Sequence, residues 1–116
     1  MQTILVVDDD TTICQTLSMI LRGRGYHVVG AASHGEAERH FERNAVDLVI
    51  FDHGLAGVTG SALARRFKGM KKVWVLMLTG DRKLLGTTAA VDVLLPKPPH
   101  VPSLLAEIEG LFARAA

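Results

Sequence analysis

The stretch Val46–Phe51, which reads VDLVIF and is followed directly by Asp52, decides the fold. Four other short runs have the same character, because they are rich in Val, Leu and Ile and do not alternate between apolar and polar residues. Continuous runs of this length are typical of strands in a parallel sheet that is covered on both faces. The five runs, in chain order, are Thr3–Val7, Tyr26–Ala31, Val46–Phe51, Val73–Leu78 and Val91–Leu95.

The segments between these runs have helical spacing, so strand and helix alternate five times. This order predicts a parallel three-layer α/β sandwich. Ser33 and Glu36 predict a capping box at the start of the second helix, and Pro102 suits the first turn of the last one. The apolar helix faces expected to pack on the sheet contain Ile13, Leu17, Ile20 and Leu21, then Leu63, Phe67 and Met70, then Leu104, Ile108, Leu111 and Phe112.

Length and composition exclude several classes of protein. The 116 residues fit one domain, which we expect to span residues 1–116. Thirteen basic and twelve acidic side chains give no electrostatic reason to expect nucleic-acid binding. No apolar run reaches the roughly 18 residues that span a bilayer, and the N-terminus has no signal-peptide pattern. Because the single cysteine, Cys14, cannot form an internal disulfide, we expect a cytoplasmic protein.

Polar side chains follow the ends of the predicted strands: Asp8, Asp9 and Asp10 the first, Asp52 the third, Thr79 the fourth and Lys97 the fifth. In such folds the carboxyl ends of the strands form the binding edge. Clustered carboxylates repel one another unless a cation lies among them, and Mg²⁺ is the hard ion that such sites hold beside phosphate oxygens. A lysine and a threonine suit the other oxygens of a phosphoryl group, which an aspartate can accept as an acyl phosphate.

Four segments of the chain resemble the receiver domains of bacterial two-component response regulators. They occur in the order of that family, and the resemblance runs from about residue 3 to residue 115. It implies a flavodoxin-like (βα)5 sandwich whose five-stranded parallel sheet has the order 2-1-3-4-5. The segments are the acidic stretch Ile4–Asp10, the phosphorylation-site stretch Asp47–Gly60, the threonine stretch Leu76–Gly80 and the lysine-proline stretch Leu94–Pro98.

The resemblance also implies a role for individual residues. Asp52 would be the phosphoacceptor, with Thr79 and Lys97 bound to phosphoryl oxygens, and the peptide bond between Lys97 and Pro98 would be cis. Mg²⁺ would be the cofactor. Its ligands would be Asp8, Asp9, Asp52 and the backbone carbonyl of Gly54.

A receiver domain is a phosphoacceptor switch that assists its own phosphorylation and dephosphorylation, and it is not a turnover enzyme. The resemblance therefore implies a sensor histidine kinase or a histidine phosphotransfer protein as the phosphoryl donor. An output protein or an effector domain would receive the signal. We expect no direct binding of nucleic acid or membrane by this domain.

Two positions and the length of one segment depart from the family pattern. Ala56 replaces a usual proline, and Leu94 replaces the usual tyrosine or phenylalanine. The span from Thr79 to Lys97 is about one helical turn short, which predicts a shortened or irregular fourth helix within residues 80–90.

Two alternatives remain open from the sequence. One is a haloacid-dehalogenase-type phosphatase that uses Asp8 as nucleophile, since residues 8–12 fit the opening motif of that family. The other is a receiver-like interaction module that is never phosphorylated. Simpler roles are expected elsewhere: Asp10 as a helix cap, Cys14 as a packing residue and Trp74 as a core residue. A solvated helix face is expected for Arg65, Arg66, Lys68, Lys71 and Lys72.

Overall fold

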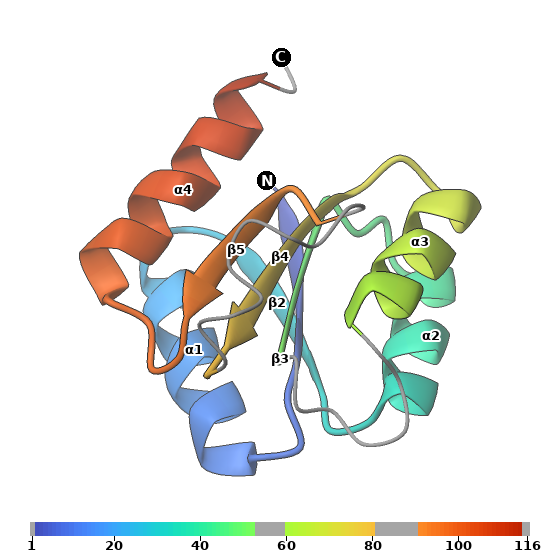
Figure 1. Cartoon of the computed structure of the whole chain (residues 1–116), viewed down its shortest axis with the longest axis horizontal. Coiled ribbons are helices and arrows are strands. Elements are labelled where there is room, and N and C mark those ends of the chain that lie inside the picture. Colours follow the sequence, from blue (N-terminus) through green and yellow to red (C-terminus); the bar gives the residue numbers. More distant parts are fainter. Residues whose placement is uncertain (1, 53–59, 81–90, 115–116) are drawn as a thin grey trace.

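Five parallel strands form a single sheet in the computed structural model, which describes residues 2–52, 60–80 and 91–114. The strand order, β2-β1-β3-β4-β5, confirms the predicted flavodoxin-like arrangement (Figure 1). Each strand begins at most two residues later, and ends at most one residue later, than its predicted run. The strands are β1 (Thr3–Val7), β2 (His27–Ala31), β3 (Leu48–Asp52), β4 (Trp74–Thr79) and β5 (Val93–Pro96).

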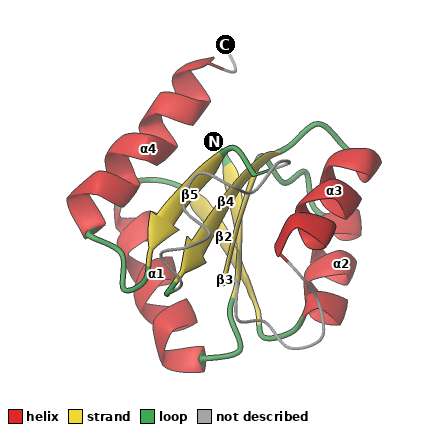
Figure 2. Ribbon diagram, viewed as in Figure 1, coloured by secondary structure: helices red, strands yellow, loops and turns green. Residues whose placement is uncertain are grey.

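Helices cover both faces of this sheet and complete the three layers. Figure 2 shows α1 and α4 on one face and α2 and α3 on the other. The predicted short helix between β4 and β5 falls on residues 81–90, outside the described residues, and stays a prediction. The described helices are α1 (Thr11–Gly23), α2 (His34–Arg43), α3 (Gly60–Met70) and α4 (Val101–Arg114).

The core divides into two clusters because successive residues of a strand face opposite sides of the sheet. In β1, Ile4 and Val6 pack on the α1–α4 side, where Leu17, Leu21, Leu104, Ile108 and Leu111 are buried. Leu5 and Val7 pack on the α2–α3 side against Phe41 and Phe67, whose rings lie 4.7 Å apart. Met70 was predicted to pack there too, but it is 39% exposed because it ends α3. Leu63 lies outside the described side chains.

Side chains at the helix starts confirm most of the predicted caps. Asp10 is the N-cap of α1 and accepts hydrogen bonds from two backbone N–H groups of the first turn, at 3.0 and 3.2 Å. Ser33 caps α2 and accepts from the backbone N–H of Glu36 at 3.2 Å. The Glu36 carboxylate accepts in return from Ala32, at 2.9 Å, and not from the cap residue itself. Pro102 lies in the first turn of α4, as predicted.

The basic cluster at the end of α3 is only partly a solvated face. Arg66 pairs with Glu38 of α2 at 2.6 Å, and Lys68 pairs with Asp92 at 2.7 Å. Lys71 donates to two backbone carbonyls at the end of α2. Three of the five cations therefore tie α3 to neighbouring elements. The two exposed members that make no such bond to a described residue are Arg65 and Lys72.

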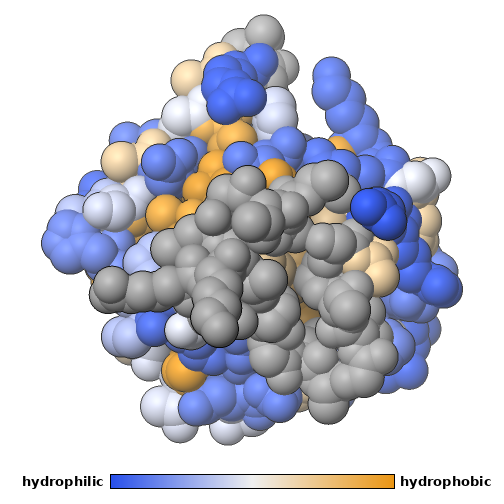
Figure 3. All heavy atoms as spheres, viewed as in Figure 1, coloured by the Kyte–Doolittle hydropathy of each residue, from blue (hydrophilic) through white to orange (hydrophobic). Residues whose placement is uncertain are grey.

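The surface is hydrophilic over most of the coloured area in Figure 3, and apolar side chains reach it mainly beside α4. None of the helices in the described ranges is long and apolar enough to cross a membrane.

Candidate functional site

The strand register brings the predicted site residues to the carboxyl edge of the sheet. Asp8 directly follows β1, and Asp52 is the last residue of β3. The neighbouring strands end level with one another, because Val7 pairs with Phe51 in β3 and Thr79 pairs with Pro96 in β5. Side chains that are separated by up to 89 residues in the sequence therefore meet at this edge.

Lys97 joins the groups at this edge. Its Nζ donates a hydrogen bond of 2.7 Å to Oδ2 of Asp52 and lies 3.4 Å from Oδ2 of Asp8. Its backbone N–H donates to the carbonyl of Thr79 at 2.9 Å, which holds the first residue after β5 against the end of β4. The peptide bond between Lys97 and Pro98 is cis, which confirms the expectation from the family resemblance.

Asp8, Asp9 and Asp52 form a compact group of carboxylates. One oxygen of each lies within 4.8 Å of the others. Asp8 is 2% exposed, Asp9 is exposed and Asp52 is intermediate, so the group opens to solvent on one side. Hard oxygen ligands in this number suit Mg²⁺, which keeps several waters in its shell. Gly54, the fourth predicted ligand, lies outside the described residues.

Burial and neighbouring charges shift the pKa values of two groups of the site, Asp8 and Lys97. Burial raises the pKa of Asp8, and the negative charge of Asp52 raises it further. A hydrogen bond from the backbone N–H of Asp10 and the ammonium of Lys97 lower it, but the pKa remains above its ordinary value. The pKa of Lys97 is also raised, because its bond to Asp52 and the charge of Asp8 outweigh the lowering by burial. A cation is therefore favourable beside these carboxylates.

The other residues singled out from the sequence have different places. Thr79 is 2% exposed at the end of β4, next to the strand that ends in Asp52. Asp10 uses its side chain to cap α1, and it is not part of the compact carboxylate group. Leu94 is partly buried against the α2–α3 core, whereas Ala56 lies outside the described residues.

Comparison with known proteins identifies the family. Residues 4–109 match the family model of the response regulator receiver domain. The chain belongs to this family. The identification confirms the interpretation of the sequence as a receiver domain of two-component response regulators. It also argues against the phosphatase alternative. The opening motif of that family would require Asp10 in the catalytic group, whereas the side chain of Asp10 caps α1.

Curated relatives of this receiver domain are regulatory, sensory transduction and respiration control proteins by name. It is 32% identical over 116 residues to the regulatory protein VanRB of Enterococcus faecalis, covering 97% of this chain and 53% of that protein. It is 32% identical over 115 residues to the aerobic respiration control protein ArcA of Escherichia coli, covering 96% and 48%. The chain thus spans about half the length of the curated relatives it matches.

Solved structures show the same architecture. A receiver domain protein from Clostridium thermocellum has a TM-score of 0.89 and 30% identity, covering 99% of this chain and 97% of that one. The response regulator TrrA from Thermotoga maritima, solved in complex with Mg²⁺ and BeF, has a TM-score of 0.85 and 29% identity, covering 96% and 99%.

Two aspartates at the other edge of the receiver domain have roles that the sequence analysis missed. Oδ2 of Asp47, directly before β3, accepts from the backbone N–H of Thr3 at 2.8 Å. Oδ2 of Asp92, directly before β5, accepts from the backbone N–H of Val75 at 2.8 Å and pairs with Lys68. Each aspartate holds the first residues of the neighbouring strand. The available signal was an aspartate immediately before, or at the start of, an apolar run.

Proposed function

We propose that this receiver domain, taken to span residues 1–116, accepts a phosphoryl group on Asp52 and thereby switches between two conformations. The observation that carries the proposal is the 2.7 Å bond between Nζ of Lys97 and Oδ2 of Asp52, made beside two further carboxylates. Receiver domains of response regulators are phosphorylated by histidine kinases and regulate output domains. The proposed donor here is a sensor histidine kinase or a histidine phosphotransfer protein.

The acidic group fits Mg²⁺ as the cofactor. Asp8 and Asp9, together with Asp52, supply oxygen ligands within 4.8 Å of one another, and the backbone carbonyl of Gly54 is the fourth proposed ligand. The raised pKa of Asp8 supports a bound cation, because burial and the charge of Asp52 disfavour the ionised carboxylate more than Lys97 and the N–H of Asp10 stabilise it. When bound, Mg²⁺ supplies positive charge that offsets the charge of the phosphoryl oxygens.

The residues of the chain account for the transfer itself. A carboxylate oxygen of Asp52 attacks phosphorus in line, so that an O–P bond forms while the bond from phosphorus to the donor imidazole nitrogen breaks. The electron pair of that bond returns to the imidazole. The Lys97 ammonium, paired with the carboxylate before transfer, then pairs with a phosphoryl oxygen, and the hydroxyl of Thr79 donates to another.

The switch follows from these altered bonds. Phosphorylation replaces the single charge of Asp52 with a larger dianionic group, and the new contacts of Thr79 and Lys97 favour one of two existing conformations. We propose that this conformation is read by an output protein or an effector domain in the cytoplasm. The domain assists its own phosphorylation and dephosphorylation in this scheme, and its product is a modified protein.

Acetyl phosphate with Mg²⁺ tests the assignment of Asp52. We expect one phosphoryl group per chain by intact-protein mass spectrometry, and we expect hydroxylamine to remove it, as it removes acyl phosphates. Asp52→Asn should reduce the labelling below detection. Asp47→Asn is the matched control, because it also removes one strand-end carboxylate but lies at the other edge of the sheet. It should leave the labelling unchanged.

Two results would contradict the proposal. Labelling that survives Asp52→Asn and disappears in Asp8→Asn would favour a phosphatase that uses Asp8 as nucleophile. Complete resistance of the wild-type protein to acetyl phosphate, to purified histidine kinases and to a beryllofluoride mimic would favour the interaction module that is never phosphorylated.

A further inference from the structure

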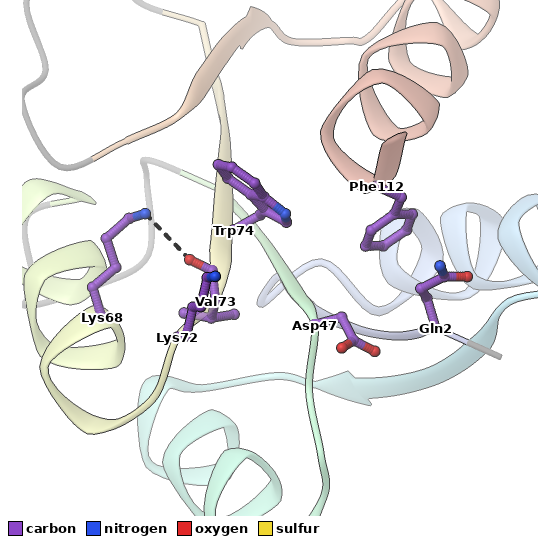
Figure 4. A pocket seen from close by; sticks show the side chains of 7 residues that line it. All are labelled: Gln2, Asp47, Lys68, Lys72, Val73, Trp74 and Phe112. Atoms are coloured by element: carbon purple, nitrogen blue, oxygen red, sulfur yellow. Dashed lines mark hydrogen bonds between the residues drawn. The ribbon is translucent and has the colours of Figure 1, made fainter. Parts of the chain in front are cut away.

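A pocket of about 360 Å³ opens at the amino edge of the sheet, the edge that lies opposite the acidic group. Gln2 and Asp47 approach it from the segments before β1 and β3, and Trp74 is the first residue of β4. Lys72 and Phe112 line it from the segment after α3 and from the end of α4 (Figure 4). Its volume is in the range of small-molecule sites. No part of the proposed phosphoacceptor site contributes to it.

Two of the residues that line the pocket are aromatic, Trp74 and Phe112. Figure 4 shows the rings of Trp74 and Phe112 on either side of the pocket. The ring of Tyr26 packs against Phe112 in a tilted arrangement, with ring centroids 5.5 Å apart. These three partly exposed rings belong to three separate segments of the chain. The other aromatic residues, Phe41, Phe51 and Phe67, are fully buried in the core. The aromatic surface that the domain leaves accessible is therefore concentrated at this pocket, although Trp74 was predicted to be a core residue.

Hydrogen-bond donors without a protein partner face the same space. Among the described residues, none accepts a hydrogen bond from the indole N–H of Trp74 or pairs with the exposed ammonium of Lys72. The guanidinium of Arg114 lies 5.3 Å from the centroid of the Trp74 ring and adds a second positive charge beside that ring. The one carboxylate of the lining, Asp47, already accepts from the backbone N–H of Thr3.

The charges around the pocket do not cancel. Lys68 also lines it, but its ammonium is paired with Asp92 at 2.7 Å, so these two charges offset each other. Lys72 and Arg114 remain against the single charge of Asp47, which leaves a positive excess. An aromatic wall with a nearby ammonium and a free N–H donor is complementary to a flat ring that carries an anionic group.

We propose that this pocket binds a small aromatic anion, with its ring between Trp74 and Phe112 and its carboxylate or sulfonate beside Lys72. The positive charges of Lys72 and Arg114 select the anion, and the two rings provide most of the buried apolar area. The proposal does not depend on phosphorylation of Asp52, because the two sites lie at opposite ends of the strands and share no residue. A failure of either proposal leaves the other standing.

Three matched probes test the ligand class by ¹H–¹⁵N NMR of the whole chain: 2-naphthoate, its neutral amide and 2-naphthylmethylamine. The chain has one tryptophan, so a single indole N–H signal reports on the pocket. We expect 2-naphthoate to shift this signal and the amides of Gln2, Val73 and Phe112 in a saturable way. The amide should bind at least about fivefold more weakly, and the amine more weakly still, because only the carboxylate pairs with Lys72.

Charge-matched variants then test the mode of binding. Lys72→Gln should weaken 2-naphthoate about threefold or more while leaving the binding of the neutral amide unchanged. Arg65→Gln, which removes an exposed positive charge of α3 that does not line the pocket, is the control and should change neither. The proposal is overturned if 2-naphthoate gives no saturable shift of the indole signal, if the amide binds as tightly as the acid, or if both variants behave alike.

Discussion

The two edges of the sheet use aspartate for opposite purposes. At the amino edge Asp47 and Asp92 each accept a backbone N–H from the start of a neighbouring strand. At the carboxyl edge Asp8 and Asp52 lie close together and share the ammonium of Lys97. The amino ends of parallel strands present N–H donors, whereas the carboxyl ends present carbonyl oxygens. At the amino edge the strands themselves supply the donors to the carboxylates. At the carboxyl edge Asp8 accepts from the backbone N–H of Asp10, just beyond β1, and a cation is still favourable beside Asp8 and Asp52.

Because of this difference, aspartates have a structural role at the amino edge and a potentially reactive role at the carboxyl edge. A carboxylate that accepts from a strand N–H stabilises the sheet, and its charge already interacts with that donor. A carboxylate held beside others keeps its charge available for a metal ion or a phosphoryl group. The predictions below test this contrast, from the largest expected effect to the smallest.

Removing one carboxylate from the acidic group should weaken Mg²⁺ binding strongly. Asp8→Asn should raise the dissociation constant at least about tenfold, because it removes both a ligand and a negative charge. Asp47→Asn, which removes the same charge at the amino edge, should change it less than about twofold. Isothermal titration or NMR titration measures both. Equal weakening by the two variants would mean that overall charge, and not a specific site, attracts the ion.

Stability should respond in the reverse pattern. Asp92→Ala should lower the free energy of unfolding by about 1–3 kcal/mol, because the N–H of Val75 loses its acceptor and the ammonium of Lys68 loses its carboxylate. Asp52→Asn should change it by less than about 1 kcal/mol, since loss of the bond to Lys97 is offset by reduced repulsion from Asp8. Urea denaturation compares them. A larger loss in Asp52→Asn would assign a structural role to the carboxyl edge.

The pH dependence of stability should reveal that ionisation of the Asp8 carboxyl is unfavourable in the folded state. Its pKa is raised above the ordinary 3.8, so the folded state retains this proton to a higher pH than the unfolded state does. Its contribution to stability is therefore greatest below that value and is lost as the pH rises through the raised pKa. Without Mg²⁺, Asp8→Asn should gain stability relative to the wild type across this window. A constant difference between the two proteins at all pH values would contradict the shift.

The emission of Trp74 should be nearly insensitive to Mg²⁺. Trp74 and Thr79 are the two ends of β4, so the indole lies roughly 16 Å along the strand from the acidic edge. Mg²⁺ should instead move the NMR signals of residues 8, 9 and 52. A strong change of the emission on adding Mg²⁺ would show that the two edges are coupled.

Much of this architecture was predictable from local patterns. The five apolar runs located the strands to within two residues, and the capping roles of Asp10 and Ser33 followed from short-range spacing. Periodicity was less reliable at the ends of elements. Met70 matches the spacing of an apolar face but is the last residue of its helix. Trp74 belongs to an apolar strand but is its first residue, and its side chain is only partly buried.

The sequence by itself determined the order of the elements, the edge that carries the acidic residues and, through the family resemblance, the candidate phosphoacceptor Asp52. Only the tertiary structure decided which charges meet: Lys97 reaches Asp52 across 45 positions of the chain. It also decided that Trp74 and Phe112 enclose a pocket with Lys72. The physical reason is that periodicity and capping depend on neighbours within a few residues. Distances between side chains of different elements depend instead on sheet register and helix packing.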